Sequence, residues 1–352
     1  MPLEVIYVVR HGFRSNWLVD PSTGDYKAYV RSPTGIAADP ALTSHGVDQA
    51  RELAAHLAAT STDGALHGAA GDDDVAAGMG GRPAALPVER IYCSPYYRCL
   101  QTIQPFVQAM AARERETAKT TAERTADSSN THKPPWWAVR CEPGLVDWFG
   151  PAPFEHPQPA PVSVLQSRFF PWIDVSASAS SSVVPPRHGE TMAQLHARVA
   201  ACLDHIVRQC DADGVRTVLL CSHAAPIIAL GRVLTGRLPD DVAVEDFGVF
   251  TCGLSLFRRR HQRQQQLRSD DTDTCNTEQH RQEAKGPVPW DDRQHTLAGQ
   301  AWTHGRGIAG GWDCEVNCDC SFLSGGEERG CTGDSVVMMR LMTEWDGRGP
   351  PF

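Results

Sequence analysis

The tripeptide Arg-His-Gly occurs twice in this chain, at residues 10–12 and at residues 187–189. A neutral histidine ring nitrogen can attack phosphorus, and an arginine guanidinium binds phosphate oxygens through two parallel hydrogen bonds. The first copy directly follows the apolar run at residues 5–9, whereas the second follows two prolines at residues 185–186 and leads into Gly-Glu-Thr. The context therefore predicts chemistry at the first copy, on His11, and only the start of a helix at the second.

Further basic and hydroxyl side chains follow two other apolar runs. Arg98 lies five residues after the run at residues 88–93, and Ser222 and His223 directly follow the run at residues 215–221. Ligands of parallel sheets bind beyond the carboxyl ends of the strands. These side chains are therefore expected to meet the first tripeptide at one sheet edge, with Ser222 contacting the substrate.

These groups must be positioned by strands that alternate with helices. The apolar runs and the helical spacing of apolar residues predict an α/β fold, with a mainly parallel central sheet and helices on both faces as a three-layer sandwich. The predicted strands are residues 5–9, 88–93, 215–221 and 251–257, and the predicted helices are residues 43–59, 98–110, 191–210 and 225–235.

The 352 residues are expected to form one domain with insertions and a tail, because several segments contain few apolar residues. Such segments cannot offset the entropy of ordering, which predicts flexible insertions at about residues 61–87, 111–135 and 176–186. The predicted organisation is a domain at residues 1–257, a low-complexity linker at residues 258–295 and a small β-rich tail at residues 296–352.

The chain resembles the histidine phosphatase (phosphoglycerate mutase-like) superfamily in six segments that occur in the family's order. They are "VVRHGFRSNW", "LTSHGVDQARELAAHL", "IYCSPYYRCLQT", "EPGLVDWFG", "GETMAQLHARVAACLDHI" and "VLLCSHAAPIIAL". Together they span most of residues 1–257, and the fourth is similar to the eukaryotic branch that includes the suppressor-of-T-cell-receptor-signalling phosphatases. The resemblance implies a phosphoglycerate mutase-like fold and a phosphatase activity.

The resemblance also implies roles for the basic residues. His11 would be the nucleophile that forms a phosphohistidine, which water then hydrolyses. Phosphoryl transfer requires positive charge around three equatorial oxygens, and arginine supplies that charge at every physiological pH. Arg10, Arg98 and Arg14 are therefore expected to bind the phosphate, with His223 completing the site. We expect no metal and no organic cofactor, because this cationic pocket neutralises the phosphate itself.

The leaving oxygen needs a proton donor, and two carboxylates compete for this role. The family commonly has a glutamate two residues after a leucine, and here Leu145 is followed two residues later by Asp147. Trp148 and Phe149 follow directly, and an apolar enclosure raises a carboxyl pKa toward a useful value. We therefore expect Asp147 to be the donor, with Glu142 as the alternative or as a substrate-binding residue.

Four cysteines near the C-terminus raise the question of a zinc site. Cys314, Cys318, Cys320 and Cys331 lack paired Cys-x-x-Cys spacing, and no histidine follows at the usual distance. Their spacing does not predict a metal centre.

Composition limits the classes of partner. The formal net charge is −9, so direct binding to nucleic acid is not expected. The first residues lack the basic and apolar regions of a signal peptide, and no apolar stretch reaches about 20 residues, the length of a membrane span. These features predict a soluble protein of the cytoplasm, the nucleus or both, with no membrane partner.

Two classes of function remain open. The first is a phosphatase acting on a phosphorylated small molecule or phosphoprotein, with a phosphoglycerate-type mutase as a less favoured variant. The second is a scaffold subunit, because the tail "GWDCEVNCDCSFLSGGEERG" resembles a short stretch of the fungal branch that includes the small phosphatase-like subunit of the RNA polymerase III general transcription factor. This tail is expected to pack on the domain or to bind a protein partner.

Overall fold

The computed structural model describes residues 2–67, 86–122, 134–178, 183–241, 244–260 and 301–330. Its centre is a six-stranded sheet with the order β5-β4-β6-β1-β7-β8. Strands β1, β4, β5 and β6 run parallel, and β7 and β8 are antiparallel additions at one edge. The bounds are β1 Val5–Arg10, β4 Arg90–Cys93, β5 Val139–Cys141, β6 Thr217–Ser222, β7 Leu254–Arg259 and β8 Trp312–Asp319.

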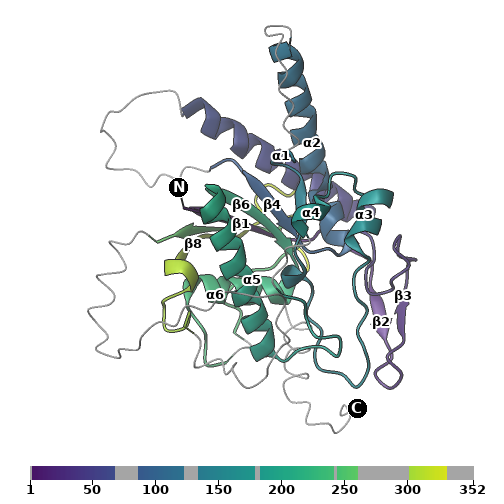
Figure 1. Cartoon of the computed structure of the whole chain (residues 1–352). Coiled ribbons are helices and arrows are strands. Elements are labelled where there is room, and N and C mark those ends of the chain that lie inside the picture. Colours follow the sequence, from purple (N-terminus) through teal and green to yellow (C-terminus); the bar gives the residue numbers. More distant parts are fainter. Residues whose placement is uncertain are drawn as a thin grey trace, which may run out of the picture.

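Helices cover both faces of this sheet, which confirms the predicted α/β sandwich (Figure 1). On one face, α1 (Ser44–His67) packs against α2 (Tyr97–Ala122), and on the other α5 (Met192–Asp213) packs against α6 (Ala224–Thr235). Successive side chains of a strand point to opposite faces. Strand β1 accordingly gives Val5, Tyr7 and Val9 to the core under α1 and α2, and Ile6 and Val8 to the core under α5 and α6.

Both N-terminal helices are longer than the apolar pattern predicted. Helix α1 continues to His67 and α2 to Ala122, where loops were expected from residues 61 and 111. For α2 composition misled, because the Ala, Glu, Arg and Lys residues of its last turns are strong helix formers even without apolar neighbours. Figure 1 shows the end of α2 projecting beyond the rest of the described chain. The remaining parts of these two predicted insertions, residues 68–85 and 123–133, lie outside the described residues.

The structure adds short elements that the sequence did not predict. Strands β2 (Trp17–Val19) and β3 (Tyr26–Ala28) form an antiparallel hairpin after β1. Helices α3 (Val162–Arg168) and α4 (Val175–Ser178) follow β5, and α4 lies in the predicted loop at residues 176–186, of which residues 179–182 are outside the described chain. A 3-10 turn, η1 (Pro143–Leu145), leads directly toward Asp147.

The described part of the tail packs back on the domain. Strand β8 pairs with β7 as the sixth strand of the central sheet, and the 3-10 turn η4 (Ile308–Gly310) precedes it. Trp302 and Trp312 are buried in the same apolar cluster as α5 and α6. Residues 261–295 of the predicted linker lie outside the described residues. Among the helices that the structure describes, none has the length and apolar character needed to cross a membrane.

Candidate active site

The carboxyl ends of β1, β4 and β6 bring the predicted basic residues together. His11 follows β1, Arg98 lies in the first turn of α2 after β4, and His223 follows β6. All three side chains are buried, and the ring centroids of the two histidines are 5.2 Å apart. Arg98 Nη2 lies 3.1 Å from His223 Nδ1. The two histidines and Arg98 therefore form one compact site at this edge of the sheet.

His11 has the hydrogen bonding of a neutral nucleophile. Its Nδ1 lies 2.9 Å from the carbonyl oxygen of Gly12, and because a carbonyl can only accept, Nδ1 carries the proton and donates it. Burial is the main cause that lowers the pKa of His11 well below its usual value, and the positive charge of Arg98 is the next. The ring is therefore neutral near pH 7, and Nε2 keeps a free lone pair for attack.

His223 is held in one tautomer by its two neighbours. An arginine can only donate, so Arg98 Nη2 donates to Nδ1, and the Nε2 proton is donated over 2.8 Å to Ser94 Oγ. Burial first and the charge of Arg98 second lower the pKa of His223 well below its usual value. The two histidines therefore differ in tautomer, although both are neutral.

Arg98 connects the site to the core of the domain. Its Nη1 donates to the carbonyl of Ala38 over 3.0 Å and lies 3.4 Å from Asp39 Oδ1. The guanidinium also lies over the rings of Tyr96 and Trp17, with centroid distances of 4.5 and 5.4 Å. Burial raises the pKa of Asp39 to about 6, against the opposing effect of Arg98. The position of Arg98 is thus fixed from several sides.

Asp147 lies against Arg98 and His223 in this site. Its Oδ2 accepts a hydrogen bond from Arg98 Nη2 over 2.7 Å and lies 3.4 Å from His223 Nδ1, while Oδ1 accepts from the backbone N–H of Trp148. The Trp148 indole donates to the carbonyl of Glu190, and Phe149 stacks on His156. The carboxylate therefore lies where an oxygen of a bound phosphate would also be stabilised.

The other two predicted polar residues hold the loop before Asp147. Glu142 accepts a hydrogen bond from the N–H of Gly144 over 2.8 Å and so caps η1. Ser222 Oγ donates to the carbonyl of Leu145 over 2.7 Å. Both contacts are made to backbone atoms of the loop, and the structure does not bring these two side chains into the Arg98–His223 group.

The structure adds a buried ion pair that sequence reasoning missed. Arg198 on α5 binds both carboxylate oxygens of Glu190, and its Nη1 donates to the carbonyls of Gly144 and Val146 over 2.8 and 3.1 Å. Both charged side chains are buried. An arginine three residues after Leu195, on the apolar face of a predicted helix, was the available signal.

Arg10 is the last residue of β1, and Arg14 lies in the loop that follows it. Arg10 Nη1 donates to the carbonyls of Val249 and Arg329. The Arg14 guanidinium lies 3.9 Å from the centroid of the Trp17 ring, and its Nη1 donates to the carbonyl of Ser15. Burial first and the charge of Arg98 second lower the pKa of Arg14 to about 9, which leaves it positively charged at pH 7.

The backbone of the second Arg-His-Gly tripeptide, at residues 187–189, accepts hydrogen bonds from the segment that follows Asp147. The carbonyl of Arg187 accepts from His156 N–H over 2.7 Å, and the carbonyl of His188 accepts from Ala152 N–H over 2.9 Å. Gly189 has a φ of +82°, and a Cβ there would lie 2.1 Å from the carbonyl oxygen of Gly150. Helix α5 begins three residues later, at Met192, close to the predicted start, with Thr191 as its N-cap in a capping box. This tripeptide therefore anchors the segment after the Asp147 loop.

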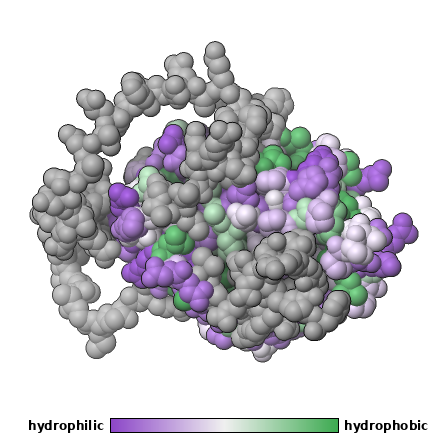
Figure 2. All heavy atoms as spheres, turned by 90° about the horizontal axis from the view of Figure 1, so that it is seen from below, coloured by the Kyte–Doolittle hydropathy of each residue, from purple (hydrophilic) through white to green (hydrophobic). Residues whose placement is uncertain are grey.

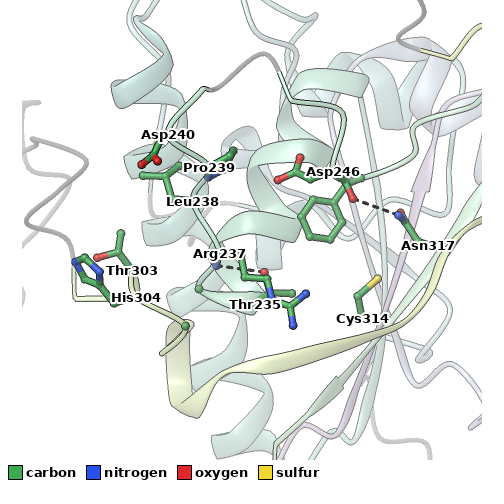
Figure 3. Close-up of a pocket in the computed structure, with 13 residues that line it drawn as sticks. Thr235, Arg237, Leu238, Pro239, Asp240, Asp246, Thr303, His304, Cys314 and Asn317 are labelled. Carbon is green, nitrogen blue, oxygen red and sulfur yellow. Dashed lines mark hydrogen bonds between the residues drawn. The ribbon is translucent and has the colours of Figure 1, made fainter. Parts of the chain in front are cut away.

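A separate cavity of about 920 Å³ opens at the C-terminal end of α6 (Figure 3). Arg237, Phe247, His304 and Asn317 are among its lining residues, and none of the residues expected to do chemistry lines it. Asp246, on its wall, is bound by the Arg232 guanidinium. In contrast, the recess beside Asp147 measures only about 10 Å³, roughly the space of one water molecule.

The surface shown in Figure 2 mixes hydrophilic residues with small hydrophobic patches over the described part of the chain. The hydrophobic residues exposed by more than half include Leu18, Tyr29 and Val30 of the β2–β3 hairpin region. Single exposed apolar residues are common on protein surfaces. The basic residues at the sheet edge are therefore a stronger indication of a functional site than these exposed apolar residues.

The model of the histidine phosphatase superfamily (branch 1) matches residues 74–272. This range is more than half of the 352 residues and contains Arg98, Asp147 and His223. The tripeptide at residues 10–12 precedes the matched range.

A curated relative is the transcription factor tau 55 kDa subunit of Saccharomyces cerevisiae, 27% identical over 345 residues. The alignment covers 96% of this chain and 60% of the yeast protein, so the chain spans about three fifths of that relative's length.

Two solved structures are similar at low identity. The ecdysone phosphate phosphatase of Bombix mori is 18% identical with a TM-score of 0.43, covering 82% of this chain and 98% of that chain. A mycobacterial hydrolase is 14% identical with a TM-score of 0.40, covering 97% of each chain.

Proposed function

Because this chain belongs to the histidine phosphatase superfamily, we propose that it is a metal-independent phosphomonoester hydrolase that acts through a phosphohistidine on His11. The observation that carries the proposal is the state of His11, whose Nδ1 proton is donated to the Gly12 carbonyl while the buried ring stays neutral. Such a ring presents Nε2 as a nucleophile beside Arg98 and His223.

In the first step, phosphate oxygens replace the Asp147 carboxylate at the Arg98 guanidinium. The displaced Asp147 carboxylate takes the proton of the substrate's phosphate monoanion. Nε2 of His11 then attacks phosphorus, the bond from phosphorus to the ester oxygen breaks, and the leaving oxygen takes this proton from the Asp147 carboxyl. Arg10 and Arg14 complete the positive charge around the phosphoryl oxygens. We favour Asp147 over Glu142 as the donor because Asp147 contacts Arg98 and lies 3.4 Å from His223, whereas Glu142 caps η1.

In the second step, water attacks the phosphohistidine. The Asp147 carboxylate takes a proton from this water, the nitrogen–phosphorus bond breaks, and inorganic phosphate leaves with His11 neutral again. The cycle consumes one ester and one water and needs no metal. The substrate is a phosphate monoester on a small molecule or a phosphoprotein.

The test uses the purified full chain with an aryl phosphate and a chelator. We expect turnover in the chelator, and we expect His11→Ala to lower kcat by about a thousandfold or more, because it removes the nucleophile. The matched control is His188→Ala, since His188 is exposed in the second tripeptide and its carbonyl contact survives the substitution. Acid-labile labelling of His11 by a radioactive phosphate ester provides an independent readout. Full activity in His11→Ala, or activity that strictly requires a metal, contradicts the proposal.

A second candidate function is that of a scaffold subunit in a nuclear RNA polymerase III transcription factor complex. The similarity to the yeast transcription factor subunit, over 96% of this chain, favours it. The two functions separate in one experiment, in which subunits of that factor are copurified with wild-type chain and with His11→Ala. Equal copurification together with no measurable turnover by the wild type supports the scaffold alone.

A further inference from the structure

The C-terminal strap, defined here as residues 320–330, lies over the N-terminal half of α1. Phe322 stacks on His56 with a centroid distance of 4.3 Å, and the backbone N–H of Ser324 donates to Glu52. Leu323 is buried in the core under α1 and α2. The strap is therefore packed into the domain on the side that carries the loop after β1.

Glu328 connects the strap to this loop. Its Oε2 lies 2.6 Å from His45 Nε2 and accepts from Gln49 Nε2 over 3.1 Å. The other end of the Gln49 amide accepts the backbone N–H of Phe13 over 2.9 Å. The carbonyl of Glu328 also accepts the N–H of Thr251. One carboxylate thus links the strap to α1 and, through Gln49, to the residue that follows Gly12.

Arg329 contacts the loop directly. Its Nη1 donates to the carbonyl of Arg14 over 3.0 Å and to Asn16 Oδ1 over 3.2 Å, and its guanidinium lies 3.8 Å from the centroid of the Phe13 ring. The Arg329 carbonyl accepts a hydrogen bond from Arg10 Nη1. Arg329 therefore contacts both Arg10 and Arg14, the two arginines that are expected to bind phosphate together with Arg98.

The backbone of Arg329 is held in an unusual conformation. Its φ is +48°, in the left-handed region that costs a non-glycine residue about 1 kcal/mol. The neighbouring Gly330 packs so closely that a Cβ there would lie 2.4 Å from the Phe250 ring. The side-chain contacts of Glu328 with α1 and of Arg329 with the loop after β1 hold the backbone in this conformation.

We propose that Arg329 is a positioning residue of the phosphate site, holding the loop at residues 13–16 and the Arg10 guanidinium in the arrangement that binds phosphate. This inference rests on the proposed function, because it assigns Arg329 to that same site. Arg329 acts through geometry rather than through its charge, since its Nη1 is directed at the Arg14 carbonyl and the Asn16 amide oxygen.

The experiment measures inorganic phosphate binding by calorimetry, and kcat and KM on an aryl phosphate, with the full chain. Arg329→Gln is expected to raise Kd and KM about tenfold while kcat stays within about threefold, because the loop that carries Arg14 loses its side-chain contacts but the nucleophile is not displaced. The matched control is Arg51→Gln, an exposed arginine of α1 paired with Asp48, and it leaves all three values unchanged. Unchanged Kd and KM in Arg329→Gln overturn the inference.

A second variant separates positioning from charge. Arg329→Lys keeps the charge but lacks the planar guanidinium, so Kd is expected to stay raised about fivefold. The defect should persist at about 0.5 M salt, where exposed charges are screened within roughly 4 Å. Full rescue by lysine, or a defect that vanishes in salt, shows that only the charge matters and overturns the inference.

Asn16→Ala removes one acceptor from the opposite side of the contact and provides a test if Arg329→Gln fails to fold. It is expected to raise Kd about threefold, as for one lost hydrogen bond, and an unchanged Kd counts against the inference. Labelling of His11 in the wild type is scored separately, so loss of the label refutes the proposed function and not the positioning by Arg329.

Discussion

The Asp147 carboxylate lies between Arg98 and His223, which are the groups expected to receive the phosphate. Under the proposed mechanism, a substrate would displace this internal anion before the chemistry begins. The displaced carboxyl would then be next to the leaving oxygen, so the movement that vacates the anion position would also place the proton donor. Competition for Arg98 would thus couple substrate binding to the readiness of the acid.

Asp147→Asn separates these two effects. The amide keeps the shape of the side chain but carries no negative charge and cannot donate a carboxyl proton. Inorganic phosphate is expected to bind severalfold more tightly, while kcat on an alkyl phosphate falls about a hundredfold, the typical contribution of a general acid. Calorimetry and steady-state kinetics measure the two quantities. Asp48→Asn, at an exposed ion pair of α1, is the control. Weaker phosphate binding by Asp147→Asn would show that the Asp147 carboxylate does not compete with phosphate for Arg98.

The buried histidines also make stability depend on pH. The pKa values of His11 and His223 are lowered well below 6.5, so below pH 6.5 the unfolded chain binds protons that the folded chain does not. Their contribution to stability is complete above pH 6.5 and is lost as the pH falls toward the folded pKa values. Each histidine adds a slope of up to about 1.4 kcal/mol per pH unit. Urea unfolding between pH 7.5 and 5.5 should show a smaller slope for His223→Asn, and an equal slope is the contrary result.

At the scale of elements, helix α5 does more than cover the sheet. Its Arg198 binds Glu190 at the helix start and, at the same time, the carbonyls of the loop that carries Asp147. Helix α5 therefore holds the loop through the Gly144 and Val146 carbonyls. Ser222 at the end of β6 binds the same loop through a third carbonyl, that of Leu145. The placement of the acid depends on these buried polar contacts.

Arg198→Met tests these contacts. It leaves Glu190 buried without its partner, which is expected to cost about 3–5 kcal/mol of unfolding free energy. The double variant Arg198→Met with Glu190→Leu removes both charges and should recover much of this stability, whereas kcat stays low because the loop carbonyls have lost their donor. Chemical denaturation and kinetics on the same samples provide the comparison. Recovery of kcat together with stability would show that the pair has no part in positioning Asp147.

At the scale of the whole molecule, the sheet edge could be predicted because it depends on local signals. The apolar runs of β1, β4 and β6 end at their polar residues, and parallel strands bring those ends together. The Arg198–Glu190 pair and the contact from Arg329 to the loop after β1 could not be predicted, because their partners are set by packing. The hairpin of β2 and β3 was missed since each strand has only three residues and none of them is buried, which gives little alternation. The length of α2 was missed because helix propensity outweighed low apolar content.

The contact between Arg10 and Arg329 joins residues 319 positions apart. During synthesis the first strand therefore leaves the ribosome long before its last neighbours exist, and β1 must also wait for β6 and β7 on either side. A nascent chain carries His11 but not the segment that fixes the arginine beside it. If this edge of the sheet binds phosphate as proposed, a chain whose translation stops before the strap would lack the Arg329 carbonyl that accepts from Arg10.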